Sequence, residues 1–256
     1  MQLEMPVSLA AAYRSPSQRA RVITEAWGSD NLYCARCNSP SLKPSRINAK
    51  AVDFSCPSCS AAFQLKSQSR SFSQRITDSA YKVMRRAIED DRAPNLLALH
   101  YDPLAWTVRD LTLIPKFAFT LSCLEKRRPL APTARRAGWV GCNILLSNIP
   151  LDARIALVCN GKPSNREWVR EQYNRLQPLE RAGIEKRGWT LDVLNVVRSL
   201  GKLQFSLDDV YQRSDDLRKL HPDNLHVREK IRQQLQRLRD MGLLQFLGYG
   251  EYRLSS

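Results

Sequence analysis

The chain has 256 residues, and its 43% hydrophobic and 25% charged content is typical of a folded protein. Its formal net charge of +15 favours a polyanionic partner such as nucleic acid or an acidic membrane surface. No apolar run approaches the length of about 18 residues that a membrane-spanning helix needs. The start, MQLEMPVSLAAAY, carries an acidic residue and no basic segment, which argues against a secretory signal. We therefore expect a cytoplasmic, prokaryotic protein with reduced thiols.

The first part of the chain mixes helical and strand-like patterns. A helix is expected at residues 8–27, and short strands are expected at 51–55 and 61–66. A second helix is expected near residues 75–90. Three apolar runs follow, at 96–101, 111–115 and 154–159. Helices and strands mixed in this way predict an α/β or α+β core.

The later part of the chain changes character twice. Residues 126–136, KRRPLAPTARR, form a basic segment that is too rich in proline for a regular helix. Residues 162–187 are strongly charged and are expected to hold a helix and then a linker. We therefore predict two domains, at residues 1–182 and 183–256.

The C-terminal segment has the element order of a winged helix, three helices and then a hairpin. The helices are expected at 190–200, 205–212 and 227–242, and the hairpin at 243–254. Ser206 should cap the second helix, and Gly242 should end the third. Trp189, at the start of the first helix, is expected in the core.

Four cysteines form two Cys-x-x-Cys pairs, Cys34 with Cys37 and Cys56 with Cys59. Each pair can hold one side of a tetrahedral ion, so the spacing predicts a structural zinc site without an open position for catalysis. The alternative is four unrelated buried thiols. Three further cysteines lack such partners and are expected to be small buried side chains: Cys123, Cys142 and Cys159.

A candidate hydrolytic site lies in the two short strands that flank the second cysteine pair. Gln64 and Lys66 share one face of their strand, whereas Phe63 and Leu65 are expected to point into the core. Asp53 and the Gln64 amide oxygen are hard donors suited to Mg²⁺, and Lys66 could orient a water molecule or offset charge in the transition state. The alternative is an edge strand with solvated polar side chains. No metal or catalytic cluster is expected from the three histidines, His100, His221 and His226.

Several segments resemble the DpnI-type restriction endonucleases. They are SQRARVITEAW at 17–27, the four paired cysteines, RRPLAPTARRAGWVGCNI at 127–144 and EKIRQQLQRLRD at 229–240. The similarity covers nearly the whole chain. It implies an N-terminal PD-(D/E)xK nuclease domain with a zinc site and a C-terminal winged helix. It also implies cleavage of GATC sites whose adenine carries an N6-methyl group, with both domains reading the methylated sequence.

The resemblance assigns roles to residues of the candidate site. Asp53 matches the metal-binding aspartate of the family, and Lys66 matches its catalytic lysine. Gln64 stands where the family has an acidic residue. Its amide oxygen can still bind a metal ion, but one negative charge is missing, so metal affinity should be lower. Glu25, on the preceding helix, is either a replacement carboxylate or part of a solvated helix face.

The N6-methyl group lies in the major groove, so a reader needs an apolar or aromatic surface there. Trp139 matches the family segment and is the candidate reader, with a core tryptophan as the alternative. The basic residues around it are expected to hold phosphates or guanines, unless they form a solvated loop. These residues are Lys126, Arg127, Arg128, Arg135 and Arg136.

In the predicted third helix of the winged helix, residues spaced at i, i+4 and i+7 should face the core: Ile231, Leu235 and Leu238. Four residues at the helix start and on its other faces are expected near the groove: His226, Arg228, Arg232 and Gln233. Arginine suits guanine and glutamine suits adenine.

These observations favour a type II restriction endonuclease that acts as a monomer on adenine-methylated double-stranded DNA. Catalytic Mg²⁺ and structural Zn²⁺ would be its metals, and the protein would serve restriction-modification. The rival hypothesis, motivated by Gln64, is a methyl-adenine-binding protein or transcription regulator with an inactive nuclease core. A winged helix occurs in many regulators, so the fold alone does not decide between them.

Overall fold

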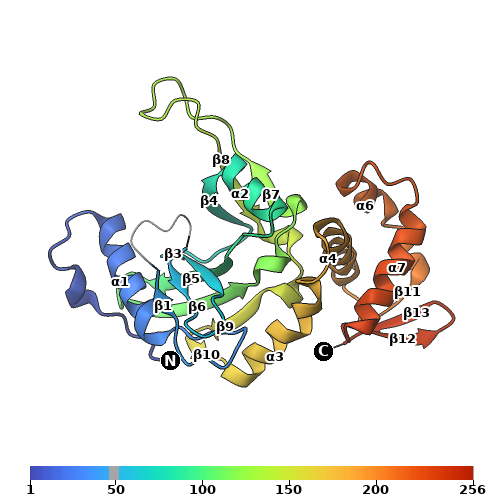
Figure 1. Ribbon diagram of the computed structural model, residues 1–256, viewed down its shortest axis with the longest axis horizontal. Helices are drawn as coiled ribbons and strands as arrows, with labels where there is room; N and C mark the ends of the chain where they lie inside the picture. Colours follow the sequence, from blue (N-terminus) through green and yellow to red (C-terminus); the bar gives the residue numbers. More distant parts are fainter. Residues whose placement is uncertain (46–51, 256) are drawn as a thin grey trace. The chain divides into compact units, whose positions relative to one another are not determined.

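The computed structural model describes residues 1–45 and 52–255, and the chain divides into two compact units (Figure 1). The first, here called the sheet unit, contains Met1–Ser73, Arg92–Lys116 and Asp152–Asn174. The second, here called the wing unit, contains Gln74–Asp91, Phe117–Leu151 and Arg175–Ser256. The spatial division therefore differs from a single cut at 182/183, which stays a prediction. Among the described residues, no helix is both long and apolar enough to cross a bilayer.

The sheet unit is built on a seven-stranded sheet in which β3 and β5 run parallel and all other neighbours run antiparallel. In spatial order the strands are β1 (Lys43–Pro44), β2 (Phe54–Ser55), β3 (Ala62–Gln68), β5 (Asn95–Asp102), β6 (Thr107–Ile114), β9 (Ile155–Cys159) and β10 (Lys162–Pro163). The strands expected at 51–55 and 61–66 are β2 and β3, although residue 51 lies outside the described residues. The three predicted apolar runs are β5, β6 and β9, which are rich in buried Leu, Ile and Val.

The predicted helix at 8–27 is wrong in its first half. Residues Val7–Ala10 form the short 3-10 helix η1, and the α-helix α1 spans Pro16–Asn31. Proline at the first helical position has no N–H to lose, and its fixed φ angle favours a helix start there. Helix α1 buries Ile23 and Trp27, and the Thr24 hydroxyl lies 3.1 Å from the Ser67 hydroxyl of β3. The helix is therefore fixed against the strand that carries the candidate site.

The wing unit begins with a three-stranded antiparallel sheet of β4 (Arg75–Ala80), β8 (Gly141–Leu145) and β7 (Leu124–Lys126). The helix predicted near 75–90 is a strand in its first half, because helix α2 spans only Tyr81–Glu89. Pairing of β4 with β8, which is distant in sequence, overrides the local pattern. The other 3-10 helices of the described residues, in both units, are η2 (Lys116–Ala118), η3 (Leu121–Cys123), η4 (Leu146–Asn148), η5 (Leu151–Ala153) and η6 (Gln177–Leu179).

Residues 162–187 contain helix α3 (Arg166–Leu176), and η6 and a few loop residues then lead into the winged helix. Its elements are α4 (Ile184–Ser199), β11 (Gln204–Ser206), α5 (Leu207–Tyr211), α6 (Ser214–Leu220), α7 (Val227–Asp240), β12 (Leu244–Gly248) and β13 (Glu251–Leu254). Strand β13 lies between β11 and β12 in an antiparallel sheet. Ser206 caps α5 through a capping box with Asp209, as predicted. Gly242, with a φ of 71°, follows the C-terminus of α7, also as predicted.

The core of the winged helix contains the residues expected there. Trp189 is 1% exposed and stacks on His221, and the three core residues predicted on α7 are all buried. A hydrogen bond of 2.8 Å from the Thr190 hydroxyl to the Gln234 side chain joins α4 to α7 inside this core. The polar pair fixes the rotation of α7, so the opposite side of that helix faces outward.

Candidate zinc and nuclease sites

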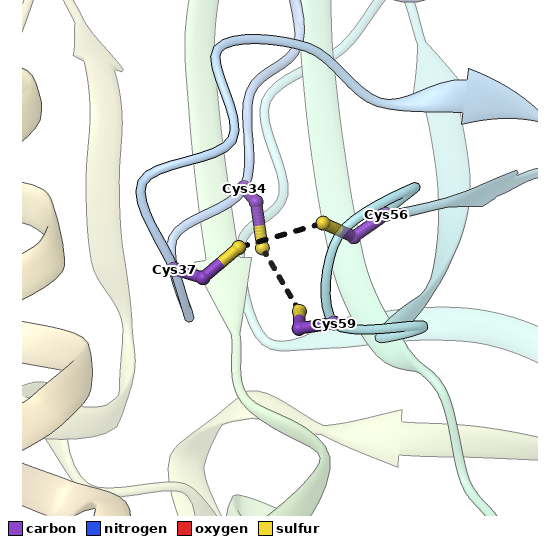
Figure 2. Close-up of side chains that lie close together, drawn as sticks. All are labelled: Cys34, Cys37, Cys56 and Cys59. Carbon is purple, nitrogen blue, oxygen red and sulfur yellow. Dashed lines mark hydrogen bonds between the residues drawn. The ribbon is translucent and has the colours of Figure 1, made fainter.

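The four paired cysteines converge, as Figure 2 shows. Their sulfur atoms all lie within 4.8 Å of one another, with 3.7 Å between Cys34 and Cys59 and 3.5 Å between Cys37 and Cys56. A tetrahedron with Zn–S bonds of about 2.3 Å would place its sulfurs about 3.8 Å apart. The cluster therefore fits a zinc ion held by four thiolates. Four sulfur ligands would leave no open position for a substrate.

Hydrogen bonds favour the thiolate form of Cys56, whereas burial raises the pKa of Cys34 and Cys59. Burial alone would raise the pKa of Cys56, but the backbone N–H groups of Cys59 and Ser58 donate to its sulfur and lower the pKa to about 6. Arg170 of α3 donates to the backbone carbonyls of Cys34 and Cys37 at 3.3 and 3.1 Å. The Cys34–Cys37 pair is thus held by a helix that lies more than a hundred residues further along the chain.

The predictions for the other cysteines are confirmed in part. Cys123 and Cys142 are buried, as expected. Cys159 is exposed, so its predicted burial is wrong. It is the last residue of β9, where the chain turns at Asn160 toward the edge strand β10.

The Cys56–Cys59 pair lies in the turn of the β2–β3 hairpin. Phe54 pairs with Phe63 and Ser55 with Ala62, while the Cys56 N–H donates to the Ala61 carbonyl at 2.9 Å. Continuing this register by one residue places Asp53 opposite Gln64. The cysteine cluster therefore sets the register that brings Asp53 to the strand carrying Gln64 and Lys66.

Two hydrogen bonds fix Asp53 to strand β3. Its backbone N–H donates to the Phe63 carbonyl at 2.9 Å, and its carboxylate accepts the Leu65 N–H at 2.7 Å. Gln64 is 8% exposed, so the predicted solvated edge strand is excluded for this position. Leu65 is half-buried rather than a core residue, which corrects the expectation from strict alternation. Phe63 and Gln64 lie on opposite faces of β3 and are both buried, so both faces are covered there and burial does not follow a simple two-residue period.

A pocket of about 520 Å³ lies between α1 and β3. Arg21, Glu25 and Lys66 all line it. The Arg21 guanidinium donates to the Glu25 carboxylate at 2.7 Å. This hydrogen bond and the charge of Glu25 raise the pKa of Arg21, and the charge of Asp53 adds to the effect. Glu25 therefore lines the same pocket as Lys66, and its role as a replacement carboxylate stays a prediction.

Oxygen donors of the types that Mg²⁺ accepts are the carboxylates of Asp53 and Glu25 and the amide oxygen of Gln64. Glu25 lines the pocket, and Asp53 and Gln64 belong to the hairpin whose strand β3 lines it. An i, i+4 pair such as Arg21 and Glu25 can be found in a sequence, but its position beside Asp53 could not be.

The basic segment forms an exposed arm between β7 and β8, residues 127–140, which projects from its sheet in Figure 1. Leu130 donates to the Trp139 carbonyl at 2.9 Å and accepts from the Gly138 N–H at 3.1 Å, so the two sides of the arm are paired. The arginines predicted to contact DNA are exposed along it: Arg127, Arg128, Arg135 and Arg136. Lys126, at its base, lies over the ring of Tyr81 at 5.8 Å.

Trp139 lies at the base of the arm and is half-buried, which excludes a core tryptophan. The Arg136 guanidinium lies over its ring at 4.7 Å. Gly141 also lies against the indole ring, because a Cβ added to this glycine would be 2.7 Å from the ring. An aromatic ring held between an arginine and a glycine is fixed in place while part of it stays accessible.

The predicted DNA-facing residues of α7 are exposed, with His226 at the helix start: His226, Arg228, Arg232 and Gln233. Arg228 and Arg232 lie over the ring of Tyr211 at 5.0 and 5.8 Å, and the Arg232 guanidinium donates to the Tyr211 hydroxyl at 2.5 Å. Gln233 accepts a hydrogen bond from Gln234 at 3.2 Å. Tyr211 thus orders two arginines on the outer face of α7, a role that the sequence pattern did not reveal.

These features define a protein with an α/β part, which carries a four-cysteine cluster, and a C-terminal winged-helix domain of the DNA-binding type. The chain belongs to the DpnI family, the Dam-replacing family, whose model matches residues 1–182. The model of the Dam-replacing HTH domain matches residues 185–254. Membership indicates a methylation-dependent restriction enzyme with a DNA-binding helix-turn-helix domain, and it confirms the resemblance and the fold class predicted from the sequence.

Proposed function

We propose that the protein is a type II restriction endonuclease that hydrolyses double-stranded DNA at GATC sites carrying N6-methyladenine. Asp53, Glu25, Gln64 and Lys66 would form its active site. The observation that carries the proposal is that Glu25 and Lys66 line one pocket, while the Asp53 carboxylate is hydrogen-bonded to the strand that carries Gln64 and Lys66. We also propose that residues 1–182 form the nuclease domain and residues 183–256 the winged helix, and that the protein acts as a monomer in the cytoplasm.

Each residue would have a distinct role. Asp53, Glu25 and the Gln64 amide oxygen would hold Mg²⁺, which when bound lowers the pKa of a water molecule and makes it a nucleophile. Lys66 would orient that water by hydrogen bonding and offset negative charge at the phosphorus centre. The Leu65 N–H fixes the Asp53 carboxylate, so little reorganisation is needed when the substrate arrives.

The DNA would be read by two surfaces. The arginines of the arm and of α7 would contact phosphates and guanines, and Gln233 would contact adenine. Trp139 would supply the apolar face for the methyl group. We propose that the four cysteines bind a structural zinc ion that braces the hairpin.

The direct test is incubation of the protein and Mg²⁺ with plasmid DNA from adenine-methylating and non-methylating hosts. We expect cleavage of methylated plasmid alone. Equal cleavage of both plasmids, or cleavage of the unmethylated plasmid alone, would exclude methyl dependence.

Gln64 also supports a second candidate, a methyl-adenine-binding protein with an inactive nuclease core. An amide gives one negative charge fewer than the acidic residue of the family pattern. If the wild-type protein binds methylated duplex but cuts no plasmid with Mg²⁺ or Mn²⁺, this second function is correct.

A further inference from the structure

A second pocket, of about 330 Å³, adjoins the Glu25–Lys66 pocket at the same end of the sheet. Ser69 and Tyr101 line both pockets. His100 of β5 lines the second pocket. Lys66 pairs with Ala98, two residues before His100, so His100 and Lys66 share one face of the sheet. Strand geometry places their Cα atoms roughly 8 Å apart.

The His100 ring is held in a defined orientation. Its Nδ1 lies 2.8 Å from the Asp110 carboxylate, whose other oxygen accepts the Asn160 N–H at 2.9 Å. Burial alone would raise the pKa of Asp110, but the hydrogen bonds from His100 and Asn160 hold it below its ordinary value. An ionised Asp110 keeps a proton on Nδ1. The other ring nitrogen, Nε2, is then the atom that can serve a ligand.

A β-bulge brings a second cation to this pocket. His100 pairs with Asp110 and Tyr101 pairs with Val108, so Arg109 is the extra residue of β6. The Arg109 guanidinium donates to Asp102 at 2.7 Å, and this hydrogen bond lowers the pKa of Asp102 to about 2. The Arg109 side chain nevertheless stays 53% exposed. It therefore has N–H groups to offer to a ligand while its position is fixed by Asp102.

We propose that His100 and Arg109 form a second phosphate-binding subsite, which holds a neighbouring phosphate of the DNA strand whose scissile phosphate lies at Lys66. The proposal rests on the proposed nuclease function. Lys66 and His100 lie on adjacent strands of one rigid sheet, so the subsite would fix the path of the DNA backbone across the active site. Phosphate contacts of this kind position a nucleic acid without reading its sequence.

Because Nδ1–H is committed to Asp110, the ring donates Nε2–H to a phosphate in its cationic form. The Arg109 guanidinium, which lines the same pocket, offers permanent N–H donors beside it. The charged groups near the ring are Asp110 and Arg109 on β6, Asp102 on β5 and Lys66 on β3, with Arg21 and Glu25 of α1 lining the adjoining pocket.

The test measures binding of two fluorescein-labelled duplexes by anisotropy, with Ca²⁺ in place of Mg²⁺ to prevent cleavage. One duplex contains a fully methylated GATC site, and the other lacks GATC and methyl groups. At about pH 6, His100→Gln should weaken binding of both duplexes by about tenfold and reduce the salt dependence by about one phosphate contact. His100→Arg, a permanent cation, should restore binding of both duplexes.

Thermal melting of each variant under the same conditions separates a binding defect from a folding defect. If His100→Gln binds both duplexes as the wild type does at about pH 6, or if His100→Arg does not restore binding, the subsite is excluded. A wild-type protein that binds both duplexes equally would disprove methyl recognition, yet the His100 effects would still decide the subsite. A wild-type protein that binds neither duplex would overturn both proposals.

Discussion

The carboxylate of Asp53 accepts a hydrogen bond from the backbone N–H of Leu65 at 2.7 Å, so the candidate metal ligand is fixed by the strand that carries Gln64 and Lys66. Asp53 therefore has two properties that substitutions can distinguish, its charge and the oxygen that accepts this hydrogen bond. Asp53→Asn keeps an acceptor oxygen but loses the charge, whereas Asp53→Ala loses both.

We expect both Asp53 variants to lose plasmid cleavage by at least about a hundredfold, because the metal loses an anionic ligand. Asp53→Asn should melt close to the wild type, and Asp53→Ala should melt lower because the half-buried Leu65 N–H loses its hydrogen-bond partner. Cleavage rates and thermal melting check the two effects. Wild-type cleavage by Asp53→Asn would remove Asp53 from the active site.

Gln64→Glu should raise metal affinity and lower stability without metal. A carboxylate at a position that is 8% exposed should cost roughly 1–3 kcal/mol of unfolding free energy until a cation neutralises it. Added Mg²⁺ should therefore raise the melting temperature of this variant more than that of the wild type, and cleavage should saturate at lower Mg²⁺ concentration. An unchanged Mg²⁺ response in both measurements would show that Gln64 is not a ligand.

Loss of the cysteine cluster should disorder the hairpin before it affects any DNA contact. We expect Cys56→Ala to lose bound zinc, measured by elemental analysis, and to melt lower by roughly 10 °C or more. Cys159→Ala is the matched control, because Cys159 is exposed and outside the cluster. A Cys56→Ala protein with normal melting and cleavage would contradict the bracing role.

Trp139→Ala should reduce the preference for methylated over unmethylated duplex by about tenfold, because an apolar surface for the methyl group is lost. Trp168 is the matched control, since it is 44% exposed and lies on α3 in the sheet unit. Trp168→Ala should keep the wild-type preference. Equal preferences in the two variants, measured by competition binding, would exclude Trp139 as the methyl reader.

The sequence by itself determined the features that depend on short spacings. The two Cys-x-x-Cys pairs are a local signal of a metal site that does not depend on the surrounding fold. The helix order, the Ser206 cap and the Gly242 stop are likewise local features of the winged helix. The segments that resemble the DpnI family led to the correct family for the same reason. The alternation of Gln64 and Lys66 likewise placed two candidate residues on one strand.

Tertiary structure alone decided the features that depend on long-range pairing. Residues 75–80 pair with β8 and are therefore a strand, although their local pattern suggested a helix. Packing of α1 against β3 turned Glu25 into a member of the pocket that contains Lys66. Glu25 and Lys66 are separated by 41 residues of sequence. Only the register of the β2–β3 hairpin and the position of α1 bring these charges together, because a carboxylate at one place and a lysine at another carry no signal of their distance in space.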